Sequence, residues 1–104
     1  MTLFPFSLLT PAGALLEGDA VFVGVRSTEG ALGVLARHAP LVAACPPGVV
    51  RVQREDGWNY FATTDAILTT DGRKVVLLTA HAEAADDEFS AQRLAQDWQQ
   101  TESE

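Results

Sequence analysis

The first eighty residues consist of short apolar runs separated by turn residues, and within each run the apolar residues recur at every second position. In the run 21–26, for example, three valines alternate with Phe, Gly and Arg. A period of two is typical of a β-strand with one buried face, whereas an amphipathic helix has a period near 3.6. The sequence therefore predicts a mainly β fold of short strands, with the valine face of residues 21–26 buried.

Two Asp-Gly pairs indicate where strands turn back on themselves. Asp56-Gly57 lies between the runs 49–55 and 58–63, and Asp71-Gly72 lies between the runs 67–70 and 74–80. Asp-Gly suits the type I′ hairpin turn, which needs positive φ at both central residues. Strands at intervals of about ten residues with Pro and Gly turns predict an antiparallel sandwich or flattened barrel. The run 74–80 is apolar on both faces, so we expect it between the core and either a neighbouring subunit or the tail.

The pattern changes after Ala85. Three acids at residues 86–88 suit a helix N-terminus, and four apolar residues then recur at helical spacing, namely Ala91, Leu94, Ala95 and Trp98. We predict one helix of about three to four turns, with Trp98 docked on the sheet. The chain then divides into a β-sandwich domain, residues 1–85, and a short acidic C-terminal helix and tail, residues 86–104.

Composition excludes several functions. The chain has 104 residues, 47% of them hydrophobic, a formal charge of -7 and a single lysine, Lys74. Nucleic acid binding needs clustered Lys and Arg, so we expect no nucleic acid partner. One cysteine cannot form an internal disulfide, which favours the cytoplasm. The apolar start of the chain is short and lacks a positive flank, so we expect neither a signal peptide nor a membrane span.

The potentially reactive residues do not form a recognisable site. Neither His38 nor His81 has the spacing of a metal-ligand pair, and Cys45 has the setting of a small buried side chain. We therefore expect no catalytic centre, no metal and no cofactor, with His38 shaping a loop. Trp58 and Tyr60 lie on one face of a predicted strand, where they could stack on a sugar, although cross-strand packing is the favoured reading.

The segment 28–41 is the most specific in the chain. It reads Thr-Glu-Gly-Ala-Leu-Gly-Val-Leu-Ala-Arg-His-Ala-Pro-Leu and resembles the signature loop of the epsilon subunit of rotary, F-type ATP synthases. That loop reads Glu-Gly-x-Leu-Gly and, a few residues later, Pro-Gly-His-Ala-Pro-Leu. The following segment 47–51, Pro-Gly-Val-Val-Arg, is similar to the family's Lys-Pro-Gly-x-x-Arg. The matches continue over about residues 8 to 88.

The resemblance implies a fold and a role. The epsilon fold is an antiparallel β-sandwich of about ten short strands followed by helices. The role is that of a non-catalytic central-stalk subunit in a proton- or sodium-translocating ATP synthase. Its partners are the gamma subunit and the proteolipid (c) ring, with the alpha/beta head nearby, and it couples ring rotation to that head. It lies peripherally on the cytoplasmic face of the bacterial inner membrane and meets the membrane only through partners.

The resemblance also implies which residues meet partners. We expect one ring-facing pole made of the signature residues, and weaker gamma contacts at a sheet edge and on the Trp98 helix. The candidate interface residues are Glu29, Gly30, Leu32, Gly33, His38, Ala39, Pro40, Leu41 and Trp98. The alternative is a free-standing β-sandwich that binds a carbohydrate or another ligand through Trp58 and Tyr60.

Three departures from the family pattern are visible. Thr64-Asp65-Ala66 stands where the family has Ser-Gly-Gly, so we expect a turn of different shape, because Ala takes positive φ only with strain. Ala36-Arg37 stands where the family has Pro-Gly. About twenty residues follow the last predicted strand, so we expect the family's second, inhibitory helix to be absent.

Overall fold

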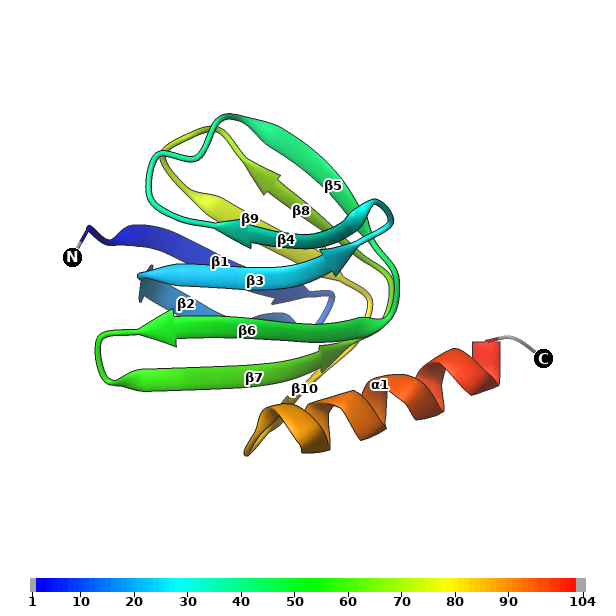
Figure 1. The fold of residues 1–104 in the computed structure, drawn as a ribbon. Coiled ribbons are helices and arrows are strands. Elements are labelled where there is room, and N and C mark those ends of the chain that lie inside the picture. The colour runs from blue at the N-terminus through cyan, green and yellow to red at the C-terminus, as the bar shows by residue number, and fades with distance from the viewer. Residues whose placement is uncertain (1, 103–104) are drawn as a thin grey trace.

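The chain forms two β-sheets packed face to face, with one helix against the outer surface of one sheet (Figure 1). The structure is a computed structural model that describes residues 2–102, with side chains described up to residue 98. The strands are β1 (Phe4–Thr10), β2 (Gly13–Ala20), β3 (Phe22–Ser27), β4 (Gly30–Val34), β5 (Leu41–Cys45), β6 (Gly48–Arg54), β7 (Gly57–Thr63), β8 (Ala66–Thr70), β9 (Val75–Thr79) and β10 (Ala82–Ala85), and the helix is α1 (Glu88–Glu102).

Each sheet has five strands. The first sheet has the order β2-β1-β9-β8-β5, and the second has the order β10-β7-β6-β3-β4. The predicted β-sandwich followed by one short helix is thus confirmed. One pairing differs from the antiparallel prediction, because β1 and β9 run parallel. Most of the chain lies between these two strands, which gives the connection that a parallel pair needs.

Large apolar side chains fill the space between the sheets. Val23 and Val25 are buried there, which confirms the predicted valine face of β3, while Val21 lies at a bend before that strand. We call the buried set the interior cluster; it includes Phe4, Phe6, Leu8, Val23, Val34, Val52, Phe61, Leu68 and Leu77.

Both predicted hairpins form, but the first turns one residue earlier than expected. Arg54 pairs with Gly57, so residues 55–56 make the turn and Gly57 begins β7 with φ +136°. Among the residues that the structure describes, Arg37 is the only non-glycine with positive φ. The type I′ prediction is therefore wrong for Asp56-Gly57, because that turn needs positive φ at both of its central residues.

The second hairpin has a longer connection than predicted. Thr70 pairs with Val75, which leaves residues 71–74 in the turn, and Gly72 there has φ +94°. The Asp71 carboxylate accepts hydrogen bonds from the backbone N–H groups of Arg73, at 2.8 Å, and Lys74, at 3.0 Å. These bonds hold the pKa of Asp71 below its ordinary value, because they stabilise the charged carboxylate.

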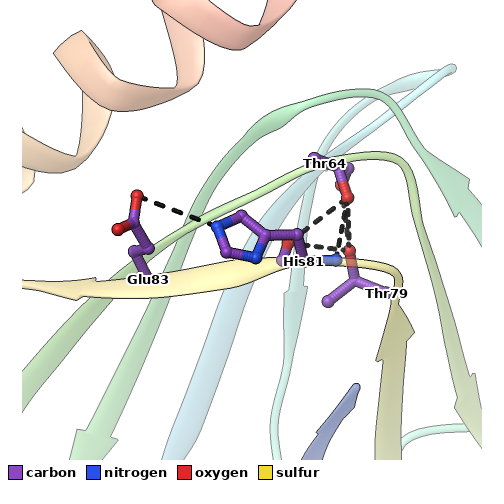
Figure 2. Close-up of polar contacts among 4 residues, drawn as sticks. All are labelled: Thr64, Thr79, His81 and Glu83. Carbon is purple, nitrogen blue, oxygen red and sulfur yellow. Dashed lines mark hydrogen bonds and ion pairs between the residues drawn. The ribbon is translucent and has the colours of Figure 1, made fainter. Parts of the chain in front are cut away.

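The chain crosses between the sheets five times, and two of these crossings lie side by side. β7 passes to β8 through residues 64–65, and β9 passes to β10 through residues 80–81. The His81 backbone N–H donates to the Thr64 hydroxyl, which lies 3.0 Å from the Thr79 hydroxyl (Figure 2). The Thr79 hydroxyl in turn donates to the Asp65 carbonyl, at 3.0 Å. Ala66 already lies in β8 without positive φ, so this turn needs no glycine there.

Helix α1 begins at a side-chain cap and packs on the second sheet. The Asp87 carboxylate accepts a hydrogen bond from the Ser90 backbone N–H at 2.7 Å, which lowers the pKa of Asp87. Three buried alanines make the centre of the contact, and larger residues surround them. We call this set the helix seam: Ala62, Ala91 and Ala95, surrounded by Val49, Tyr60, Ala85, Leu94 and Trp98. The predicted stripe and the docking of Trp98 are confirmed.

Candidate partner-binding surfaces

The outer surface of the first sheet is apolar, and no helix within the described residues lies on it. Leu9, Leu78, Ile67 and Ala44 stand opposite one another on four neighbouring strands and form a cross-strand row. Ile67 and Leu78 are 48% and 47% exposed. We call this surface the outer apolar face: Leu9, Val42, Ala44, Ile67, Val76 and Leu78. β9 is thus apolar on both faces as predicted, but α1 packs on the other sheet and does not cover it.

A groove of about 720 Å³ hollows one end of this face. Leu9, Ala44, Ile67 and Leu78 line it, together with Cys45 at its inner side. Burial raises the pKa of the Cys45 thiol, which keeps it neutral. Cys45 is therefore the small buried side chain that the sequence predicted.

The β3–β4 turn forms the end of the sandwich next to this groove. The Ser27 hydroxyl donates to the Gly30 carbonyl at 2.9 Å and accepts from the Glu29 backbone N–H at 3.1 Å. The Thr28 backbone N–H donates to the Ala44 carbonyl at 3.0 Å, which ties the turn to β5. Gly30 has φ +123°, a conformation that favours glycine. We call residues 28–30 the turn pole.

Leu32 and Gly33 lie in the middle of β4 and have packing roles. Leu32 is half-buried against the interior cluster. The Phe22 ring lies over Gly33 and its cross-strand neighbour Gly24, so that a Cβ on Gly33 would come within 2.8 Å of the ring. The Leu-Gly pair of the signature therefore lets an aromatic ring lie flat across two strands.

The loop between β4 and β5 forms the opposite end of the sandwich. The His38 ring nitrogen Nδ1 donates to the Ala39 carbonyl at 2.7 Å, and the His38 backbone N–H donates to the Leu35 carbonyl at 3.2 Å. This geometry agrees with the prediction that His38 shapes the loop. A Cβ on Gly72 would lie 3.6 Å from the His38 carbonyl oxygen, so the loop touches the β8–β9 turn. We call residues 35–40 and 71–74 together the loop pole.

The signature residues thus lie at two poles instead of one. Ser27 pairs with Gly30 at one end of β4 and Val23 pairs with Val34 at the other, and Figure 1 shows the two connections at opposite ends of the sandwich. Five residues of strand rise roughly 16 Å. The prediction of a single pole is wrong, because a strand separates Glu29 and Gly30 from His38, Ala39 and Pro40. Leu41 begins β5 near the loop pole.

Aromatic side chains cover part of the second sheet. Trp58 stacks on Tyr60, with ring centroids 6.3 Å apart and an interplanar angle of 13°, and Phe22 meets Trp58 edge-on at 6.0 Å. The expected cross-strand packing is confirmed. Tyr60 also packs in the helix seam, whereas Trp58 remains 46% exposed.

An ion pair and a ring contact join the helix to the sandwich. An Arg51 nitrogen lies 3.5 Å from a Glu88 oxygen, and the His81 ring meets the Trp98 ring at 5.1 Å and 64°. His81 also lies 3.9 Å from the Glu83 carboxylate (Figure 2).

In the described part of the chain, no three metal-ligating side chains gather in one place and no helix is long and apolar enough to cross a membrane.

Sequence reasoning missed two surfaces. The outer apolar face had one detectable signal, the run 74–80, which is apolar on both faces. Its other members come from strands whose order in the sheet cannot be predicted from the sequence of each strand. The loop pole gathers the exposed cations Arg37, Arg73 and Lys74, and no local pattern links the two segments that supply them.

Comparison with known proteins places this geometry in a family. Residues 3–85 match the family "ATP synthase, Delta/Epsilon chain, beta-sandwich domain". The ATP synthase epsilon chains of Desulforudis audaxviator and Ruminiclostridium cellulolyticum are 35% and 34% identical to the chain over 81 and 87 residues. These matches cover 78% and 84% of the chain, and the chain spans 59% and 65% of the relatives' length.

Two solved structures share the fold. A chain of the Euglena gracilis mitochondrial ATP synthase, in a structure of OSCP, F1 and the c-ring, superposes with a TM-score of 0.77 at 20% identity. That match covers 99% of this chain and 66% of the other. A chain of the Tetrahymena thermophila mitochondrial ATP synthase central stalk and c-ring gives a TM-score of 0.69 at 14% identity, covering 94% and 90%.

Proposed function

Because this chain belongs to the ATP synthase delta/epsilon chain family, we propose that it is a non-catalytic central-stalk subunit of an F-type ATP synthase. The observation that supports this most directly is the family match over residues 3–85, which spans all ten strands from Phe4 to Ala85. In this role the subunit couples rotation of the proteolipid ring to the catalytic head through gamma. We retain the division after Ala85 as part of the proposal.

The β-sandwich has the stiffness that a subunit transmitting rotation needs. A connector under torque has to resist bending, and in this chain every strand is hydrogen-bonded into a sheet. The two sheets are also tied together at the crossings by the hydrogen bonds of Thr64 and Thr79. Rigid elements of this kind hold interaction surfaces in fixed relative positions.

We assign the outer apolar face to the gamma subunit. Exposed apolar surface on a folded domain is typical of a protein contact, and this face is continuous from Val42 on β5 to Leu9 on β1. Its groove offers space for apolar side chains of a partner. Trp98 is a secondary candidate, because its indole is only partly covered in the helix seam.

We assign the ring contact to the turn pole with Glu29 and Gly30. A subunit seated in the angle between an upright shaft and the ring below it has to present two adjoining surfaces. Thr28 of the turn pole also lines the groove of the outer apolar face, so the two surfaces adjoin. Leu32 and Gly33 support this end from within β4, and His38, Ala39, Pro40 and Leu41 are left for a different contact at the opposite end.

The location follows from the partners. The similar epsilon chains of Desulforudis audaxviator and Ruminiclostridium cellulolyticum come from bacteria, which supports a peripheral position at the cytoplasmic face of the bacterial inner membrane. Attachment to that membrane would then be through gamma and the proteolipid ring.

Co-purification tests the proposal. The tagged full-length chain is expressed in its own host, the membranes are solubilised in mild detergent, and the bound proteins are identified by mass spectrometry. We expect the alpha, beta and gamma subunits together with the proteolipid. A matched Ile67→Asp/Leu78→Asp variant places charge on the outer apolar face and should lose all of them. Recovery of the natural chain alone, from an extract whose synthase is intact, would contradict the proposal.

A further inference from the structure

We propose that the loop pole is a docking surface for an acidic patch on a protein partner. The inference rests on the proposed function only in that the partner is taken to be another subunit of the synthase. The surface consists of residues 35–40 and 71–74, next to the Val42 end of the outer apolar face, and its cations are Arg37, Arg73 and Lys74.

The first observation is a local reversal of charge. The chain has a formal charge of -7, with 14 acids against 7 Lys and Arg, yet three of those seven cations lie in the two segments of the loop pole. All three side chains are exposed. Asp71 is the one acid in these segments, and its carboxylate accepts the backbone N–H groups of Arg73 and Lys74. The pole is therefore basic on an acidic molecule.

The second observation is the backbone of Arg37. Its φ of +64° lies in the left-handed region, which a residue with a side chain occupies at a cost. Glycine would occupy this conformation freely, and no hydrogen bond within the described residues explains an arginine there. A strained position that holds an exposed cation is more readily explained by a function of the side chain than by stability.

The third observation is that the cations are held on a fixed frame. The two hydrogen bonds of His38 brace the β4–β5 loop from within. The Asp71 carboxylate and the Thr70 hydroxyl, which accepts the Gly72 backbone N–H at 3.1 Å, brace the other turn. The segments touch at His38 and Gly72. The backbone that carries the three cations is thus ordered before a partner arrives, which lowers the entropy cost of binding.

The fourth observation is apolar surface beside the cations. Leu35, within the pole, is 59% exposed, and Val42, at the adjoining end of the outer apolar face, is 75% exposed. Exposed charge pairs alone contribute little affinity, because water and salt screen them. Apolar contact next to the charges favours a protein surface, where both kinds of contact are made together.

The charge distribution also argues against an extended polyanion. The molecule is 41 Å long, whereas charges are screened within about 8–10 Å at physiological salt. A compact acidic patch can meet the pole alone. An anionic membrane or a nucleic acid would also approach the acids elsewhere on the surface, and these repel it.

Binding to a depleted synthase tests the proposal. Detergent-solubilised synthase lacking this subunit is immobilised, and the full-length chain is bound to it at 50, 150 and 400 mM NaCl. The test variant is Arg37→Glu/Arg73→Glu. The matched control is Arg26→Glu/Arg93→Glu, which changes the formal charge equally at exposed positions outside the loop pole. Thermal unfolding of each protein checks that it is folded.

We expect the pole variant to bind at least about tenfold more weakly at 150 mM NaCl, because reversed charges repel an acidic patch. The difference should shrink at 400 mM, and the control should stay within about twofold of the natural chain. Arg37→Gly, which suits the backbone and removes one cation, should weaken binding severalfold.

Each other outcome overturns the inference in a recognisable way. Equal weakening by both double variants would assign the effect to net charge, and no weakening by the pole variant would remove the loop pole from the interface. Tight, pole-dependent binding to protein-free vesicles containing phosphatidylglycerol would make lipid the partner. If the natural chain failed to bind the depleted synthase at all, the stalk assignment itself would fall.

Discussion

The interior cluster and the helix seam are both apolar contacts, but they are built from side chains of different size. The interior cluster joins the sheets through fully buried residues such as Phe6, Leu8 and Leu77, whereas the buried centre of the seam is Ala62, Ala91 and Ala95. Apolar burial stabilises by roughly 25 cal/mol per Å². The sandwich is therefore expected to be stable without the helix, and the helix to be the weaker attachment.

The polar contacts of the seam do not reverse this ranking. The Arg51–Glu88 pair is about half exposed on both side chains, and exposed ion pairs contribute about 0–1 kcal/mol. Small alanines allow the helix to approach the sheet closely, but they bury little area. Both regions are thus held by apolar contact, but the strength of the contact depends on side-chain volume. Large side chains make the sandwich rigid, and small ones leave the helix easier to detach.

The largest expected effect is in the interior. Leu77→Ala should lower the free energy of unfolding by about 2–5 kcal/mol, because it leaves a cavity between the sheets. Urea denaturation followed by circular dichroism measures this. The neighbouring Leu78→Ala, on the outer apolar face, is the control and should change stability by less than about 1 kcal/mol. Equal losses would mean that the outer face also supports the fold.

A smaller and more local effect is expected in the seam. Ala91→Leu should force the helix away from β7 at a cost of about 1–3 kcal/mol, because the close contact has no room for the added carbons. Hydrogen exchange should become faster in α1 and stay unchanged in β6 and β9. Arg93→Leu, at an exposed helix position, should leave both regions unchanged. Faster exchange throughout the sandwich would contradict the separation of the two regions.

A change at Thr79 tests how much the hydrogen bonds at the two adjacent crossings stabilise the sandwich. Thr79→Val keeps the side-chain shape but leaves the Asp65 carbonyl without its donor and the Thr64 hydroxyl without its neighbour. We expect a loss of about 1–2 kcal/mol in the free energy of unfolding. Thr69→Val, on the outside of β8, is the matched control. A loss no larger than that of the control would show that the hydroxyl chain does not support the crossings.

The smallest expected effect is on the helix cap and depends on pH. The hydrogen bond from the Ser90 backbone lowers the pKa of the Asp87 carboxyl in the folded state. The stabilisation that this cap gives the helix is therefore present above the unfolded pKa of about 3.9. It is lost as the pH falls through the folded pKa. Ellipticity at 222 nm should therefore decrease slightly below about pH 4.

The Asp87→Asn variant keeps a cap acceptor without a titrating group, so its helix signal should lose this pH dependence. Asp71 has a lowered pKa for a similar reason in a sandwich turn, and Asp71→Asn is the control that should leave the acid response of the helix in place. A response that is identical in all three proteins would remove the cap from the explanation.

The sequence predicted what depends on local spacing. The period of two located the strands, and the spacing of Ala91, Leu94, Ala95 and Trp98 located the buried face of the helix. The turn at Asp56-Gly57 was misplaced by one residue, because Gly57 uses its positive φ inside the strand pairing. Local signals identify that a turn exists more reliably than they identify its central residues.

What the sequence could not predict depends on contacts between distant segments. The parallel pairing of β1 with β9 has no local signal, and neither has the approach of His38 to Gly72. The single interface expected from residues 29–41 divided in two because β4 runs straight between its halves. The contact role of these candidate residues stays a prediction, and their grouping into two ends required the fold.

The position of β1 between β2 and β9 sets the order in which the molecule can be completed during synthesis. β1 is translated first, yet one of its two hydrogen-bonding edges stays open until residues 75–79 have left the ribosome. Non-local pairing of this kind slows folding, and an open apolar strand is prone to aggregate while it waits. The first sheet is thus expected to be completed only once β9 is available, and chaperones that bind nascent chains should protect the first hairpin until then.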